Sequence, residues 1–167
     1  MLDQRRIDLS KQRLDYAKDD LEDAEKLYSL ERYRSANNRI YYAVFHAIRS
    51  VLALDCVDFK KHSGVISYFH KNYINTDLVN HSFSDLIKNV IESRNNSDYT
   101  DFYIATVEEV ENNIKGTKEF LFTIDRLIEV RLEAEADIYA SKEQSSHDFD
   151  KHNYEAEIDE DEDELAR

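Results

Sequence analysis

The sequence predicts an all-α protein, an up-and-down bundle of four main helices plus one short extra helix. Two observations carry this prediction. The 167 residues include no proline and only two glycines, although the turns of a β-sheet draw heavily on both residue types. Apolar residues also recur at three- and four-residue steps in segment after segment, which is the spacing that lines one face of a helix.

Five segments carry such stripes. The expected helices cover about residues 5–30, 33–56, 64–74, 83–95 and 106–131. The second has the widest apolar face, so we expect it at the centre of the bundle. Ser63 is a suitable N-cap for the third, and Thr106 with Glu109 resembles a capping box that starts the last. Residues 95–105 should form a loop, and Gly116 should mark a close contact between helices.

The charge is distributed unevenly along the chain. The net charge is −14, and residues 143–167 hold eleven acidic and two basic side chains. Such a run repels itself and stays solvated, so we expect a helical domain over residues 1–142 and a flexible acidic tail over 143–167. An ordered contact of the tail with a basic partner is the alternative. Because phosphate contacts supply most nucleic-acid affinity, any RNA binding here requires a local basic spot.

Several classes of protein are not indicated by this sequence. The N-terminus is charged and no apolar run approaches about 18 residues, so we expect a cytoplasmic protein without a membrane span. A single cysteine, Cys56, allows neither an intrachain disulfide nor a cysteine-based zinc site. His46, His62 and His70 follow no metal-ligand spacing. The sequence therefore predicts no metal and no cofactor.

A polar stripe interrupts the apolar surface of the second helix. Arg39, Tyr42, His46 and Arg49 follow one another at steps of three or four residues, beside the core-facing side. Buried polar groups are costly unless they have partners. The stripe is therefore either a hydrogen-bonded structural network or one wall of a cleft.

Arg94 is the second candidate feature, near the expected end of the fourth helix. The helix dipole favours a positive charge there, and Asp98, four residues after Arg94, could pair with it. The alternative is a functional role, because the guanidinium fork matches the oxygens of a phosphate group.

Three segments together resemble the HEPN domain family (higher eukaryotes and prokaryotes nucleotide-binding). They are "NRIYYAVFHAIRSVL", "HSGVISYFHKNYI" and "SRNNSDYTDF", and the resemblance covers roughly residues 8–130. It implies a bundle of four main helices with a short extra one. It also implies a toxin-like protein paired with a minimal nucleotidyltransferase antitoxin. Active members of this family are metal-independent endoribonucleases that work as dimers. Their motif is an arginine, often a polar residue, and a histidine after four to six intervening positions.

The chain departs from this motif at the histidine. It supplies Arg94 and Asn95, but Tyr99, Thr100 and Asp101 occupy the positions where the histidine would fall. Metal-free cleavage of RNA needs a base that titrates near neutral pH, and the tyrosine pKa of about 10 is far from it. The motif therefore predicts phosphate binding rather than efficient cleavage. The predicted ligand-binding residues are Arg94, Asn95, Asp98 and Tyr99, facing Arg39, Tyr42 and His46.

We accordingly expect a homodimeric component that binds RNA or a nucleotide and pairs with a nucleotidyltransferase. Two alternatives stay open. The protein could be an active endoribonuclease in which His46 or His62 replaces the missing histidine. It could also be a non-catalytic interaction protein whose acidic tail docks a basic partner.

Overall fold

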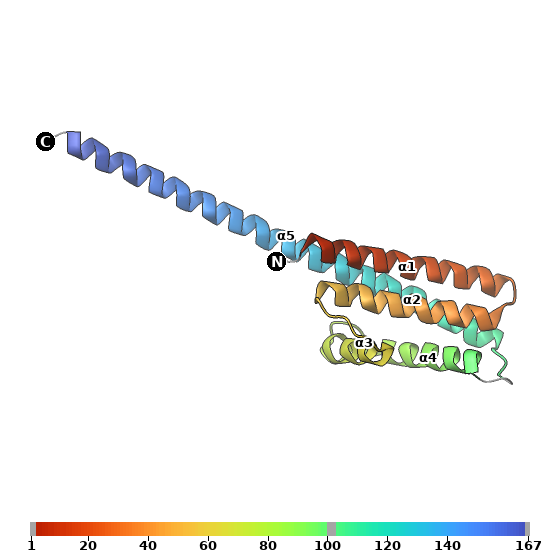
Figure 1. The fold of residues 1–167 in the computed structure, drawn as a ribbon. Coiled ribbons are helices and arrows are strands. Elements are labelled where there is room, and N and C mark those ends of the chain that lie inside the picture. Colours follow the sequence, from red (N-terminus) through yellow and green to blue (C-terminus); the bar gives the residue numbers. More distant parts are fainter. Residues whose placement is uncertain (1–2, 100–102, 166–167) are drawn as a thin grey trace. The chain divides into compact units, whose positions relative to one another are not determined.

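The computed structural model describes the backbone of residues 3–99 and 103–165, and the side chains of residues 3–97 and 103–141. Every regular element in these ranges is helical, which confirms the predicted all-α fold (Figure 1). The elements are α1 (Gln4–Ser29), α2 (Tyr33–Leu54), α3 (His62–Phe69), the π-helical turn η1 (His70–Ile74), α4 (Phe83–Tyr99) and α5 (Val107–Leu165). Contacts divide the chain into a unit that ends at Ile128 and a second that begins at Glu129.

The first unit is the predicted bundle, and α2 is its central helix. α1 packs along one side of α2, while α3 and α4 pack against it from elsewhere on its surface. The start of α5 completes the four main helices, since Lys18 of α1 pairs with Asp125 at 2.8 Å. Within the described ranges, none of the helices combines the length and apolarity that crossing a bilayer requires.

The core forms where the predicted stripes meet. Ile40, Ile48 and Leu52 of α2 are almost completely buried. The ring of Phe120 on α5 lies 5.9 Å from Phe69 of α3 and 5.2 Å from Phe83 of α4, measured between ring centroids. These edge-on contacts join the three elements, and aromatic pairs of this geometry add about 0.5–1.5 kcal/mol each beyond the burial of area.

Two helices end in turns that usually use glycine. After α1, the amide of Glu31 donates to Tyr28 at 2.9 Å and that of Arg32 to Leu27 at 2.8 Å, which is the Schellman pattern. Cys56 plays the same part after α2. Both residues have positive φ, 58° for Glu31 and 59° for Cys56. The chain thus accepts some backbone strain at these two turns in place of glycine.

The third helix differs from its prediction at both ends. It begins at His62, with Lys61 at the N-cap position, so Ser63 lies inside the helix and the predicted Ser63 cap is wrong. No side-chain hydrogen bond caps this end. The last turn widens into η1, where the amide of Asn75 donates to the carbonyl of His70 at 2.8 Å. Val65 and Phe69 are buried, as the stripe predicted.

The fourth helix is longer than predicted and does not end near Arg94. It continues to Tyr99, so residues 95–99 are helical rather than part of the expected loop. Val90, Ser93 and Ser97 are all buried. They recur at helical spacing on the inner face, and packing on that face outweighs the weak helix propensity of two asparagines.

The fifth helix begins as the capping pattern predicted, but only half of the capping box forms. The Glu109 amide donates to the Thr106 hydroxyl at 3.2 Å. The Glu109 carboxylate accepts from Tyr103 and from Asn37 instead of reaching back to the N-cap amide. Gly116 sits at a close contact, as expected, because a Cβ there would lie 2.7 Å from a Leu86 methyl.

The acidic C-terminal segment is helical in the structure. α5 runs through residues 143–165 without a break in secondary structure, so the domain boundary expected at residue 143 is not a helix end. Acidic side chains near the C-terminus of a helix oppose its dipole. That this segment adds little to the stability of the bundle stays a prediction.

Candidate functional site

The candidate site is built on three residues of α2 that lie one helical turn apart. Tyr41, Phe45 and Arg49 follow at steps of four residues, so their side chains stack along one edge of the helix. The Tyr41 and Phe45 rings are nearly parallel, with centroids 5.9 Å apart. The Arg49 guanidinium carbon lies 5.8 Å from the Phe45 ring centre. Both rings are about 5% exposed, so the stack belongs to the buried core.

Two residues from other helices complete this row. Arg94 of α4 places its guanidinium carbon 5.2 Å from the Tyr41 ring centre, at the end opposite Arg49. His62, the first residue of α3, lies over the stack with its ring 4.1 Å from that of Phe45. The Tyr41 hydroxyl and His62 Nδ1 are 2.6 Å apart and hydrogen-bonded. We call these five residues the arginine–aromatic row.

The positive charges of the row act on its titratable groups. Burial lowers the pKa of His62, and the nearby Arg94 and Arg49 lower it further. Burial raises the pKa of Tyr41, an effect that Arg94 partly opposes. His62 is therefore a neutral imidazole at neutral pH, between two guanidinium groups, and its side chain is exposed to solvent. The site is locally positive in a chain whose net charge is −14.

The predicted stripe of Arg39, Tyr42 and His46 is placed beside the row and is partly tied to α1. Asp20 pairs with Arg39 at 2.9 Å, and its other oxygen lies 3.8 Å from His46 Nε2. The Arg39 guanidinium carbon also lies 5.1 Å from the Tyr42 ring centre. These contacts favour the hydrogen-bonded network over the cleft wall for this part of the stripe.

His46 is held in its neutral form by its surroundings. Burial lowers its pKa most, followed by the charges of Arg49, Arg13 and Arg39. Its Nδ1 atom is buried without a hydrogen-bond partner among the described residues. Phe45 separates it from His62, with the Phe45 and His46 ring centroids 6.1 Å apart. His46 therefore neighbours the row without stacking within it.

Of the predicted site residues of α4, only Arg94 and Asn95 have side chains within the described residues. The Arg94 guanidinium reaches the row, and its Nη1 lies 3.5 Å from the Asn95 side-chain oxygen. Asp98 and Tyr99 belong to α4, but their side chains lie outside the described residues. The predicted site therefore stays a prediction for those two residues.

Sequence reasoning missed four residues around the row. Tyr41 and Phe45 belong to the wide apolar face that the sequence predicts for this helix, and their four-residue spacing to Arg49 is the signal that could have identified them. Arg13 of α1 and Asp58 of the α2–α3 loop were not identified at all. Arg13 donates to the Arg49 carbonyl at 3.0 Å and to Asp58 at 2.9 Å. These residues are far apart in sequence, so no local sequence pattern predicts the contacts.

Comparisons with known proteins agree with the helical bundle. The HEPN domain family matches residues 10–127. A protein named "UPF0332 protein" from Thermotoga maritima is 35% identical over 113 residues, which cover 68% of this chain and 86% of the relative. A Methanocaldococcus jannaschii protein named "Putative toxin MJ0605" is 30% identical over 115 residues, covering 69% of this chain and 85% of the relative. "Putative toxin MJ0142" of the same organism is 34% identical over 95 residues, covering 57% and 62%. Because the family model matches most of its length, the chain belongs to the HEPN domain family.

Proposed function

We propose that this protein is a toxin-like HEPN component that binds the phosphate groups of RNA at the arginine–aromatic row. The observation that carries the proposal is the placement of Arg94 and Arg49 at the two ends of the Tyr41–Phe45 stack. Guanidinium groups bind phosphate oxygens through paired N–H donors, and such charge-assisted bonds are about twice as strong as neutral ones. The toxin names of two relatives support the same general role.

The chemistry of the row favours binding over cleavage. A metal-free ribonuclease must remove a proton from the 2′-hydroxyl group and protonate the leaving oxygen. Tyr99 stands where the family motif expects a histidine. The row contains one imidazole, that of His62, and its Nδ1 is already hydrogen-bonded to the Tyr41 hydroxyl. The row therefore offers strong phosphate ligands and a weakly equipped acid–base pair.

A second candidate function rests on the position of His62. It is exposed, neutral at pH 7 and close enough to Arg94 for that charge to lower its pKa. In an active endoribonuclease, His62 would take the 2′-hydroxyl proton while Arg94 stabilises the negative charge that develops on the phosphate. His46 suits this role less, because it faces Asp20 and its Nδ1 is buried.

The partners belong to the proposal as well. We propose that the protein acts in the cytoplasm as a homodimer and pairs with a nucleotidyltransferase, as the family resemblance implies. Co-expression with a nucleotidyltransferase encoded by a neighbouring gene, followed by affinity purification and light scattering, tests both. A monomer that captures no nucleotidyltransferase would refute this part while leaving RNA binding to be judged separately.

Binding is tested with the wild type and two single variants. Fluorescence anisotropy with a short labelled single-stranded RNA should show binding that weakens with salt, because phosphate contacts release counterions. Arg94→Ala should abolish most of this binding and lower the salt slope by about 0.7 for each lost phosphate contact. Arg32→Ala, which removes an exposed arginine at the start of α2, is the matched control and should change little.

Cleavage is tested in the same buffers with a metal chelator present. We expect little or no cleavage by the wild type, and no change on substituting His62. Robust metal-free cleavage that His62→Ala stops, with RNA binding retained, would establish the ribonuclease in place of the binder. If neither binding nor cleavage is found and Arg94→Ala behaves as the wild type, the row is a structural feature and the proposal is wrong.

A further inference from the structure

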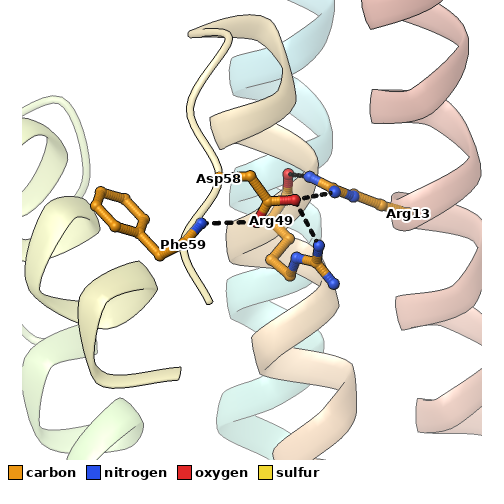
Figure 2. Close-up of polar contacts among 4 residues, drawn as sticks. All are labelled: Arg13, Arg49, Asp58 and Phe59. Carbon is orange, nitrogen blue, oxygen red and sulfur yellow. Dashed lines mark hydrogen bonds and ion pairs between the residues drawn. The ribbon is translucent and has the colours of Figure 1, made fainter. Parts of the chain in front are cut away.

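Beside the row lies a cluster of two arginines around one carboxylate. Oδ2 of Asp58 accepts from Arg13 at 2.9 Å and from Arg49 at 2.7 Å, while its Oδ1 accepts from the Phe59 amide at 2.9 Å (Figure 2). Arg13 also donates to the Arg49 carbonyl at 3.0 Å, so its position is fixed from two sides. The cluster joins α1, α2 and the loop that follows α2.

The two arginines and the carboxylate differ in how well they are buried. The Arg13 side chain is 11% exposed and that of Arg49 is 28% exposed, whereas that of Asp58 is 51% exposed. A guanidinium so deeply placed requires a negative partner, because an unpaired buried charge is strongly destabilising. Asp58 supplies that charge from the side of the cluster that is more exposed to solvent.

Charge at the cluster favours an incoming anion. Two guanidinium groups face one carboxylate, which leaves one positive charge in excess. Burial alone would raise the pKa of Asp58, but the hydrogen bonds from Arg49 and Arg13 hold it below its usual value, so the carboxylate stays ionised. Arg49 also belongs to the arginine–aromatic row, whose other end is Arg94. Positive charge therefore continues from Arg94 through Arg49 to the largely buried Arg13.

We propose that Arg13 and Arg49 form a second phosphate subsite for RNA, which Asp58 occupies in the free protein. A phosphate group and a carboxylate offer the same paired oxygen acceptors to a guanidinium fork. The exchange needs rotation of the half-exposed Asp58 side chain, which also breaks its hydrogen bond from the Phe59 amide. The loop can stay in place, because the Phe59 ring packs 5.6 Å from that of Tyr68. This inference rests on the proposed RNA-binding function and places a second phosphate at the Arg49 end of the row, with Arg13 as its other donor.

The subsite predicts that removing the competing charge strengthens binding. Asp58→Asn keeps the size of the side chain but no longer repels a phosphate or holds both arginines. We expect its affinity for the short single-stranded RNA to rise about tenfold, the effect of one charged hydrogen-bonded contact. We expect the slope of affinity against salt to stay near that of the wild type, because the same phosphate contact forms in both proteins once Asp58 has rotated away.

Three comparisons separate a local subsite from other causes. Asp23→Asn removes the same charge from an exposed position of α1 and should leave RNA affinity near that of the wild type. The double variant Asp58→Asn with Arg13→Gln should lose the added affinity, and it also removes the buried unpaired charge that could unfold the single variant. Inorganic phosphate, titrated against each protein, distinguishes a free anion from an RNA phosphate as the occupant.

Each outcome has a definite meaning. Tighter RNA binding by Asp58→Asn alone, lost in the double variant, supports the subsite. Equal affinity of the wild type and Asp58→Asn for the RNA overturns it while the proposed function stands. Equal strengthening by Asp23→Asn assigns the effect to net charge and overturns it too. A gain for inorganic phosphate without a gain for RNA overturns the assignment to RNA, and no RNA binding by any protein refutes both proposals.

Discussion

Replacing Phe45 by alanine tests whether this residue of the arginine–aromatic row is also a buried core residue. Phe45 is 5% exposed, so the substitution removes a whole buried ring. Phenylalanine-to-alanine changes in cores cost about 3–5 kcal/mol. The ring also stacks on Tyr41, contacts the tilted ring of His62 and lies against the Arg49 guanidinium, contacts that area alone does not count. We therefore expect a loss of about 4 kcal/mol.

That loss is large for a bundle of this size. Single domains unfold with about 5–15 kcal/mol, so the variant should stay folded but melt about 10 °C or more below the wild type. Urea unfolding followed by far-UV circular dichroism measures the change. The equilibrium slope should stay the same, because both proteins expose a similar surface on unfolding.

Phe122 provides the matched control, because it is the same residue type on α5 but is 70% exposed. Phe122→Ala should change the free energy of unfolding by no more than about 0.5 kcal/mol, as surface substitutions usually do. A cost below about 1 kcal/mol for Phe45→Ala, or equal costs for the two variants, would contradict the placement of Phe45 in the core.

Three further predictions concern stability. Deleting residues 144–167 should leave the melting temperature nearly unchanged, because a solvated acidic run buries little surface; a drop of many degrees would show that it docks. Burial and neighbouring arginines lower the pKa of His46 from 6.5, so the unfolded chain binds a proton more readily. Stability should therefore fall as the pH drops through 6.5 towards the folded-state pKa. The melting temperature of His46→Gln should change less steeply with pH than that of the wild type, and an equal change in both proteins would contradict this. Gly116→Ala should be nearly neutral by urea unfolding, because about 1 kcal/mol of helix propensity offsets a shift of Leu86. In a Leu86→Ala background, Gly116→Ala should stabilise the protein. A loss of stability there would show that backbone atoms, rather than the Leu86 side chain, leave no room for a Cβ at position 116.

The fold was predictable from sequence because its cause is periodic. The apolar stripes that predicted the long helices are the residues found buried, for example Leu14 and Leu21 on α1 and Ile124 on α5. The deviations occur where packing between helices overrides a local rule. Ser63 has the chemistry of an N-cap but lies inside α3, and α4 continues past Arg94 because Ser97 faces the interior.

The site was less predictable, because it depends on contacts between distant segments. The family motif identifies Arg94 from the sequence, but only the structure shows that its guanidinium lies against the Tyr41 ring. The ion pair of Arg13 with Asp58 spans 45 positions and has no periodic signature. Polar residues on one helix face can be identified from sequence, but the partners that decide their role come from whichever helix packs against that face. Asp20 of α1 illustrates this point, since it holds Arg39 and lies beside His46.

The hydrogen bond between Tyr41 and His62 governs what the row can do chemically. If the Tyr41 hydroxyl donates to Nδ1, the proton of the neutral imidazole lies on Nε2, and the free edge of His62 can only donate. If Nδ1–H donates to Tyr41 instead, Nε2 keeps a lone pair and can accept the 2′-hydroxyl proton. A phenol is a better donor than a neutral imidazole N–H, and an imidazole nitrogen is a better acceptor than a phenol oxygen. The first arrangement is therefore favoured, with the Nε2–H of His62 joining Arg94 and Arg49 as a phosphate donor. A histidine close to the arginine thus strengthens the case for binding, because the atom needed for catalysis carries a proton.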